Sequence, residues 1–154
     1  MYKRQTDILA TLASIVGTAL RDDQATDSFD MLPAMLGRVP KDESIRPHLL
    51  TQSFRGEFQL RQGSWKYLDH PGSGGNRYDR EPLDRYALPE ACPDAPGQLY
   101  DLETDPGERT NLFESEPERR EAMRALLEQL KSGGRSAPTG RIPVGIENIP
   151  LLDR

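Results

Sequence analysis

Three short segments separated by glycine turns place the strongest limit on how this chain can fold. They comprise residues 49–54, 57–62 and 64–68. The turns fall at Arg55-Gly56 and Gln62-Gly63, and strands joined by such short turns run antiparallel. In the middle segment Phe58 and Leu60 alternate with polar residues, which predicts one buried and one solvated sheet face.

The second half of the chain adds a strand and a helix to this sheet. Residues 98–102 are predicted to form a fourth strand after a long loop over 70–96, which is rich in glycine and proline. A turn at 105–108 precedes a helix that opens near Pro117 and ends at Gly133. Its apolar residues are Ala122, Met123, Leu126, Leu127 and Leu130. Their helical spacing predicts that one helix face packs on the sheet.

Two helices are predicted before the sheet. The first spans 7–20, with Thr6 as its cap and Asp7 at the positive end of the helix dipole. Its apolar residues cover an arc of roughly 160°, wider than the stripe of about 100° on a surface helix. Such a helix needs burial from more than one side, so part of its packing partner is expected outside this chain. A shorter helix over 28–37 starts at Ser28 or Asp30 and stops at Gly37.

Composition excludes several classes of partner. The 154 residues carry 25 acidic and 20 basic side chains, and the resulting net charge of −5 gives no broad attraction to nucleic acid or anionic lipid. No apolar run approaches the roughly 20 residues of a membrane span. The first seven residues lack the order of charge, apolar stretch and cleavage site that marks a signal peptide. The single cysteine rules out an internal disulfide.

Few residues in the sequence suggest chemistry. His48 and His70 each adjoin a proline in a predicted loop, and Cys92 has no basic neighbour in the sequence to activate its thiol. Asp22-Asp23 lacks the further oxygen ligands that a hard cation needs. The run 72–75, Gly-Ser-Gly-Gly, lacks the Lys-Ser/Thr pair of a phosphate loop. We interpret all of these as structural or solvated positions.

Two phrases in the sequence are more specific. The first is Gly56-x-Phe58-x-Leu60-Arg61-x-Gly63-x-Trp65-Lys66-Tyr67. The second is Gln98-Leu99-Tyr100-Asp101-Leu102-x-x-Asp105-Pro106-x-Glu108-x-x-Asn111-Leu112. In this order they resemble the C-terminal portion of sulfatases of the arylsulfatase type, and weaker likenesses extend the resemblance over nearly the whole chain.

The resemblance implies an α+β fold: a small four-stranded antiparallel sheet with a C-terminal helix. The preceding helices would belong to the alkaline-phosphatase-like α/β domain of the full enzyme. Three parts are therefore expected. Residues 1–37 form the helical end of the α/β domain, residues 38–131 form the sheet-and-helix subdomain, and residues 132–154 form a docked tail.

The family's chemistry would have to come from elsewhere. Its nucleophile is a formylglycine made within C/S-x-P-x-R, and its calcium is held by the large domain. The run 136–141, Ser-Ala-Pro-Thr-Gly-Arg, places its arginine one residue too late. The resemblance thus implies a chain that is inactive alone, partnered by the missing N-terminal catalytic domain, and that meets a sulfated carbohydrate or aryl ester only in the complete enzyme. Full-length relatives are often exported.

Substrate contact is expected at one place only. Some relatives have a histidine pair where this chain has Thr51-Gln52, so Gln52 and Ser53 are the candidates for touching a substrate. An alternative is that the chain is a free-standing binding module that kept this subdomain without its chemistry.

Overall fold

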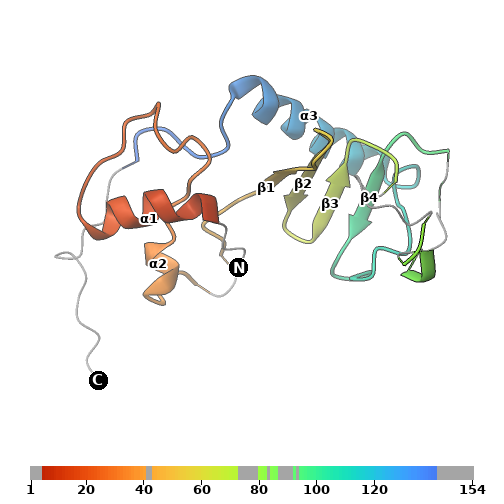
Figure 1. Ribbon diagram of the computed structural model, residues 1–154, viewed down its shortest axis with the longest axis horizontal. Helices are drawn as coiled ribbons and strands as arrows, with labels where there is room; N and C mark the ends of the chain where they lie inside the picture. Colours follow the sequence, from red (N-terminus) through yellow and green to blue (C-terminus); the bar gives the residue numbers. More distant parts are fainter. Residues whose placement is uncertain are drawn as a thin grey trace. The chain divides into compact units, whose positions relative to one another are not determined.

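The computed structural model describes residues 5–40, 43–72, 80–82, 84–86, 92 and 94–141. The chain divides into two compact units. Unit 1 combines Met1–Pro47 with Leu130–Arg154, and unit 2 is His48–Gln129. Figure 1 labels helices α1 and α2, which belong to unit 1, and the four strands, which belong to unit 2.

Unit 2 is built on a four-stranded antiparallel sheet, which confirms the predicted fold class. Its strands are β1 (Leu49–Gln52), β2 (Phe58–Gln62), β3 (Trp65–Leu68) and β4 (Gln98–Asp101), and they lie in chain order. Leu60 pairs with Tyr67, and Tyr67 pairs with Leu99. Directly opposed residues share a face, so these three side chains form one buried row across the sheet.

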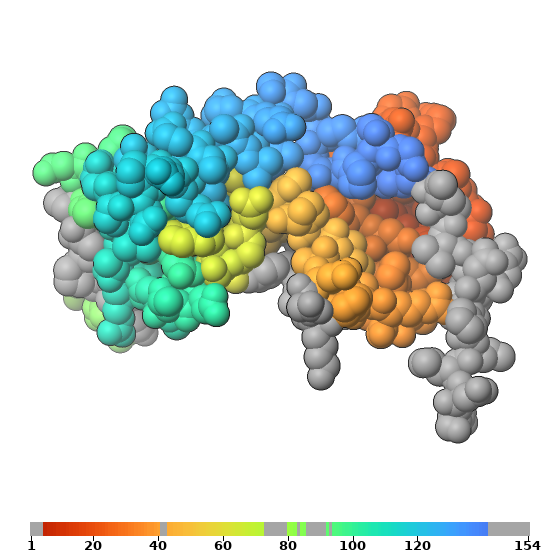
Figure 2. All heavy atoms as spheres, turned by 180° about the vertical axis from the view of Figure 1, so that it is seen from behind, coloured from red at the N-terminus to blue at the C-terminus, as the bar shows by residue number. Residues whose placement is uncertain are grey.

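Helix α3 (Pro117–Gly133) covers that row. Met123 and Leu127 are fully buried, as the apolar stripe predicted, whereas Ala122 of the same stripe is exposed. Seen from behind in Figure 2, the helix lies over the strands. Trp65, on the same sheet face, is half-buried beneath the guanidinium of Arg119 at 5.0 Å. Phe58 is also half-buried, so the deepest part of this core is aliphatic.

The opposite sheet face is not simply solvated, contrary to the sequence prediction. Leu68, Gln98 and Tyr100 point to that side and are buried. The Gln98 side chain donates to the carbonyls of His70 and Gly72, at 3.1 and 2.6 Å. Residues 70–72, which follow β3, therefore lie against the start of β4, which alternation along single strands could not reveal. Within that loop, Asp84–Tyr86 form a 3-10 turn.

Helix α1 of unit 1 spans Ile8–Ile15, after a 3-10 turn at Gln5–Asp7. It stops five residues before the predicted end, because Gly17 adopts a left-handed φ of 70°. The amides of Gly17 and Thr18 then bond back to the carbonyls of Ser14 and Ala13, as in a Schellman motif.

Helix α2 is a single turn, Leu32–Met35. Of the two residues predicted to start it, Asp30 accepts a hydrogen bond from the Leu32 amide at 2.9 Å. Gly37 ends it with a φ of 68°, as expected. Ser28 instead accepts a hydrogen bond from the amide of Ala10 in α1.

Asp7 joins the elements of unit 1. It precedes the first turn of α1, as expected, and its carboxylate accepts a hydrogen bond from the Phe29 amide at 3.0 Å and pairs with Arg46. The α1 helix has no side-chain cap, so the predicted capping by Thr6 is wrong. Both charged side chains are buried, and the Arg46 guanidinium also stacks on Phe29, 4.2 Å from the ring centre. Thr11 on the next turn of α1 accepts a hydrogen bond from the Met31 amide.

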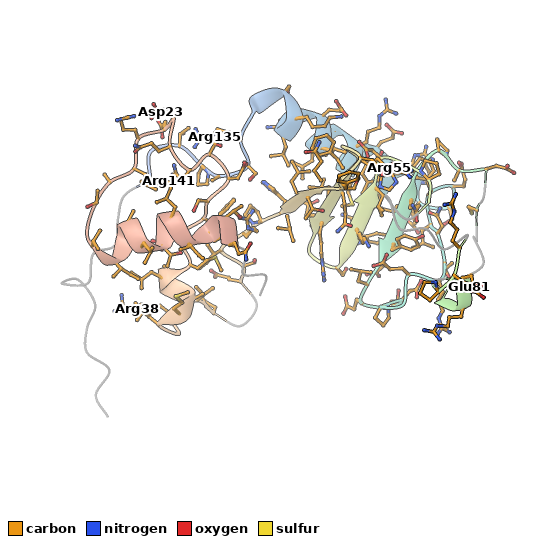
Figure 3. The ribbon with its side chains drawn as sticks, viewed as in Figure 1. Asp23, Arg38, Arg55, Glu81, Arg135 and Arg141 are labelled. Atoms are coloured by element: carbon orange, nitrogen blue, oxygen red, sulfur yellow. The ribbon has the colours of Figure 1, made fainter. Side chains whose placement is uncertain are left out.

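The segment 135–141 lies on the loop that follows α1. Ser136 donates to the Asp27 carboxylate at 2.8 Å, and the Arg135 guanidinium donates to the Asp22 carbonyl at 2.9 Å. Arg141 donates to the carbonyls of Gln24, Ala25 and Ser28. Figure 3 shows Arg135 and Arg141 on the same side of unit 1 as Asp23. These bonds join two parts of the chain more than 100 residues apart.

The aliphatic core of unit 2 leads to a stability prediction. Leu60→Ala or Leu127→Ala should each lower the free energy of unfolding by about 2–5 kcal/mol, because each removes a fully buried side chain. Phe54→Ala is the control and should leave stability nearly unchanged, because Phe54 is fully exposed in the β1–β2 turn. Urea denaturation followed by circular dichroism measures all three. Equal midpoints for wild type and Leu60→Ala would contradict the assigned core.

The buried ion pair of unit 1 leads to a second prediction. Asp7→Ala should cost about 3–5 kcal/mol, because it strands the buried Arg46 charge. Asp23→Ala removes the exposed pair between Arg21 and Asp23 and should cost at most about 1 kcal/mol. Thermal unfolding of both variants provides the comparison, and equal losses would contradict the role given to Asp7.

Candidate functional site

Residues of the second sequence phrase make hydrogen bonds that stabilise unit 2. Tyr100 donates its hydroxyl hydrogen to Gln98 at 2.7 Å, which fixes the Gln98 amide that secures the long loop. Asn111 accepts hydrogen bonds from the amides of Leu99 and Phe113, both at 3.0 Å, and donates to the Gly97 carbonyl. These residues tie β4 to the segment that leads into α3.

The turn after β4 uses the acidic residues of the same phrase. Asp105 accepts hydrogen bonds from the amides of Arg109 and Thr110, at 2.7 and 2.8 Å. Glu108 pairs with Lys66 of β3 at 2.5 Å. The pKa of Asp101 lies below its usual value, because the Ser64 side chain and the Glu103 amide donate to its carboxylate. The phrase therefore contains the turn predicted at 105–108 and the side chains that stabilise it, and the sequence alone did not reveal these side-chain contacts.

Gln52 and Ser53 lie where β1 passes into the hairpin turn. The Gln52 amide donates to the Gly56 carbonyl at 3.0 Å. The Ser53 hydroxyl donates to Glu57 at 3.1 Å and accepts hydrogen bonds from the amides of Arg55 and Glu57. Both side chains help close the turn.

The other polar candidates are engaged in local structure. Asp22 accepts a hydrogen bond from the Gly140 amide, and Asp23 pairs with Arg21 at 3.0 Å. His70 is buried beside the Pro71 carbonyl. The Cys92 thiol lies 3.7 Å from the Asn111 carbonyl. The glycine run at 72–75 lies outside the described residues after Gly72.

Among the described residues, no group of three or more His, Cys, Asp and Glu side chains could hold a metal ion. The near-match at 136–141 is also structural, since Ser136 bonds to Asp27 and Arg141 binds main-chain carbonyls. None of the helices described is long and apolar enough to span a bilayer.

The feature best suited to a function is an apolar surface on unit 1, which we call the α1 face. Ile8, Leu9 and Leu12 are 52–54% exposed and Val16 is 71% exposed. A shallow cavity of about 350 Å³ opens beside them. It is lined by Gln5, Asp7, Ile8, Thr11, Leu12, Ile15, Met31 and Met35.

Burial on α1 is the reverse of what an ordinary amphipathic helix shows. The residues of α1 buried within unit 1 are Ala10, Thr11 and Ser14, which are small or polar. The large aliphatic residues Ile8, Leu9 and Leu12 face outward. Large contiguous apolar patches are uncommon on free protein surfaces and mark places where another body packs. The α1 face is therefore a candidate docking site.

The sequence is similar to that of several sulfatases. It is 31% identical over 128 residues to the N-acetylgalactosamine-6-O-sulfatase of Bacteroides thetaiotaomicron, a match covering 83% of this chain and 23% of that enzyme. It is 32% identical over 111 residues to arylsulfatase A of Homo sapiens, covering 70% of this chain and 21% of that enzyme. The choline-sulfatase of Rhizobium meliloti is 27% identical over 110 residues. No family model matches the chain.

The fold matches as well. A sulfatase structure from work on the metabolism of multiple glycosaminoglycans by Bacteroides thetaiotaomicron superposes with a TM-score of 0.62 and 30% identity. The match covers 82% of this chain and 24% of that one. The chain thus spans about a quarter or less of the length of these relatives. By sequence and by fold, it belongs to the sulfatases of the arylsulfatase type and corresponds to their C-terminal portion.

Proposed function

We propose that this chain serves as the C-terminal part of a sulfuric ester hydrolase and docks through the α1 face onto the catalytic α/β domain. The observation that carries the proposal is the outward apolar side of α1. The relatives supply a suitable occupant, because more than three quarters of each of their chains lies beyond the match. On this proposal unit 1 belongs to the α/β domain, and the sheet of unit 2 is the C-terminal subdomain.

The free energy available at this face is large enough to matter. Four side chains, Ile8, Leu9, Leu12 and Val16, are at least half exposed. Full burial of such a side chain contributes about 1.5–3 kcal/mol, so covering the remaining half of all four would contribute about 3–6 kcal/mol. Small domains are stable by only about 5–15 kcal/mol in total. Docking would thus contribute a substantial part of the stability of unit 1.

The chemistry of the reaction belongs, on this proposal, to the domain on which the chain docks. That domain would provide the formylglycine nucleophile and the calcium ligands. The substrate would be a sulfate ester of a carbohydrate or an aryl alcohol, in line with the names of the relatives. Gln52 and Ser53 remain the proposed substrate contacts from this chain, and a substrate would compete with the hydrogen bonds that both side chains make in the hairpin turn.

The first test concerns activity. The purified 154-residue chain should not hydrolyse 4-nitrophenyl sulfate above a blank, with or without calcium. Its described residues provide no metal cluster. Its match to C/S-x-P-x-R, residues 115–119, lies at the start of α3, where the Ser115 hydroxyl donates to the Leu112 carbonyl and the Arg119 guanidinium lies over Trp65. A relative's catalytic domain stripped of its matching portion should gain activity when this chain is added. Calcium-dependent turnover by the chain alone would contradict the proposal.

The second test concerns the α1 face itself. Wild-type chain should self-associate and bind a hydrophobic dye, because its aliphatic side chains are uncovered. Ile8→Lys with Leu12→Lys should lower both signals without unfolding the chain, since both side chains already face solvent. The matched control is Ala122→Lys with Ala125→Lys on the exposed side of α3, which should change neither signal.

Analytical ultracentrifugation and dye fluorescence read out this second test. A wild-type chain that is monomeric at high concentration and binds no dye would favour the alternative, a free-standing binding module. Unfolding of the double lysine variant would show instead that α1 packs on its own unit.

A further inference from the structure

The turn between β1 and β2 presents an aromatic ring and a cation that neither the family phrases nor the docking of α1 uses. The Ser53 carbonyl accepts a hydrogen bond from the Gly56 amide at 3.0 Å. Phe54 and Arg55 are therefore the two central residues of a tight turn. The Ser53 amide donates to the Glu57 carbonyl at 2.7 Å and closes the hairpin. Gly56 has a φ of 90°, which a residue with a β-carbon rarely adopts.

Phe54 contributes nothing to the core of unit 2. Its side chain is fully exposed, although burial of a phenylalanine contributes about 1.5–3 kcal/mol. The neighbouring residues Gln52, Arg55 and Gly56 are exposed as well, and none of them is apolar. The ring is thus isolated, unlike the aliphatic side chains of the α1 face. It lacks the contiguous apolar area on which another protein domain would pack.

The guanidinium of Arg55 is available to a ligand. Its side chain is exposed and makes no hydrogen bond or ion pair with the described part of the chain. The carboxylate of Glu57, two residues further on, accepts a hydrogen bond from the Ser53 hydroxyl at 3.1 Å. A guanidinium carries five N–H donors in a planar fork, which suits the paired oxygens of an anionic group.

Side chains on either side of Phe54 and Arg55 hold the turn in one conformation. The Ser53 hydroxyl accepts hydrogen bonds from the amides of Arg55 and Glu57, both at 3.2 Å. The Gln52 side chain donates to the Gly56 carbonyl at 3.0 Å. A preorganised turn loses less conformational entropy when a ligand binds. The side chains of Phe54 and Arg55 can also contact a ligand without breaking any of these hydrogen bonds.

A sugar ring with an anionic substituent suits this pair of side chains. One face of a sugar ring carries C–H groups with partial positive charge, and these pack on the negative face of an aromatic ring. A guanidinium beside the ring can bind a carboxylate or a sulfate through two parallel hydrogen bonds. A small aryl sulfate would offer a single group to one of the two side chains at a time.

We propose that Phe54 and Arg55 form a specificity site for the carbohydrate part of the substrate. Phe54 packs on a sugar ring of the chain, and Arg55 binds a carboxylate or sulfate carried by that ring. This inference rests on the proposed function for its substrate class, a carbohydrate sulfate. A contact of one ring and one guanidinium binds weakly by itself, with a dissociation constant of about 1 mM.

Nuclear magnetic resonance of the full 154-residue chain, labelled at phenylalanine, tests this contact directly. The sequence has only four phenylalanines, and Phe54→Ala assigns the signal of Phe54. That signal should shift saturably with a chondroitin 6-sulfate tetrasaccharide, which carries carboxylates and sulfates on alternate rings. The buried Phe29 signal should not move. An unsulfated chondroitin tetrasaccharide distinguishes the anions, because equal binding identifies the carboxylate and weaker binding identifies the sulfate. No saturable shift with either tetrasaccharide would overturn the proposal.

Variants measure the share of each side chain, with affinity read from the sugar signals. Phe54→Ala should weaken binding about 2–10-fold. Arg55→Gln should weaken it about threefold or more, and more at low salt than at high salt. Arg55→Lys should recover only part of that loss, because an ammonium lacks the planar fork. Arg109→Gln makes the same charge change at an exposed site outside the hairpin and should have no effect. Wild-type affinity in both Phe54→Ala and Arg55→Gln would overturn the proposal.

Sedimentation with a relative's catalytic domain that lacks its C-terminal portion separates this inference from the proposed function. Phe54→Ala should associate with that domain as wild type does. Loss of association in Phe54→Ala, with sugar binding unaffected, would overturn the specificity site and make the ring a domain contact. Sugar binding by a wild-type chain that does not associate would support the site and contradict the proposed function.

Discussion

The buried carboxylate of Asp7 sets the orientation of α1, and much of the surface of unit 1 follows from it. It binds the Phe29 amide and Arg46, so this side of α1 must face inward. Thr11, one turn further along α1, lies on the same inward side and accepts a hydrogen bond from the Met31 amide. Since a helix has only one side to turn toward a given neighbour, Ile8 and Leu12 are left outside. A buried ion pair is a poor source of net stability but a strong determinant of geometry.

The residues that identify the family in this chain are structural. Gln98 secures the long loop and Asn111 closes the connection into α3, each through hydrogen bonds to main-chain groups. Such bonds need a particular side chain at a particular place, because a buried main-chain group left without a partner costs about 1–3 kcal/mol. The family can therefore be identified from residues whose role is structural.

Sequence reasoning recovered the strand order and α3 because their signals are local. Glycine turns separate β1, β2 and β3, and a regular apolar stripe marks α3. The predictions were wrong where the backbone conformation of one residue, or a contact with a segment distant in the sequence, determines the structure. The early end of α1 depends on the left-handed Gly17, and the burial of Gln98 depends on a loop that starts 28 residues earlier.

The sequence did indicate that the wide apolar arc of the first helix needs a partner outside the chain. The structure sharpens this expectation, because it shows that the inward side of α1 is the polar one. For Gln52 and Ser53 the sequence was less informative. Their role in substrate contact was expected from the family resemblance alone, and the structure places their side chains in the hairpin turn.

Hydrogen exchange along α1 tests whether the α1 face docks onto a sulfatase catalytic domain. Amide exchange of Ile8–Ile15 would be followed in the free chain and after addition of a sulfatase catalytic domain that lacks its own C-terminal portion. We expect the α1 amides to exchange fast in the free chain and to be strongly protected in the mixture, with little change in β2 and β3. Equal exchange of α1 in both samples, under conditions where the two proteins bind, would contradict docking through the α1 face.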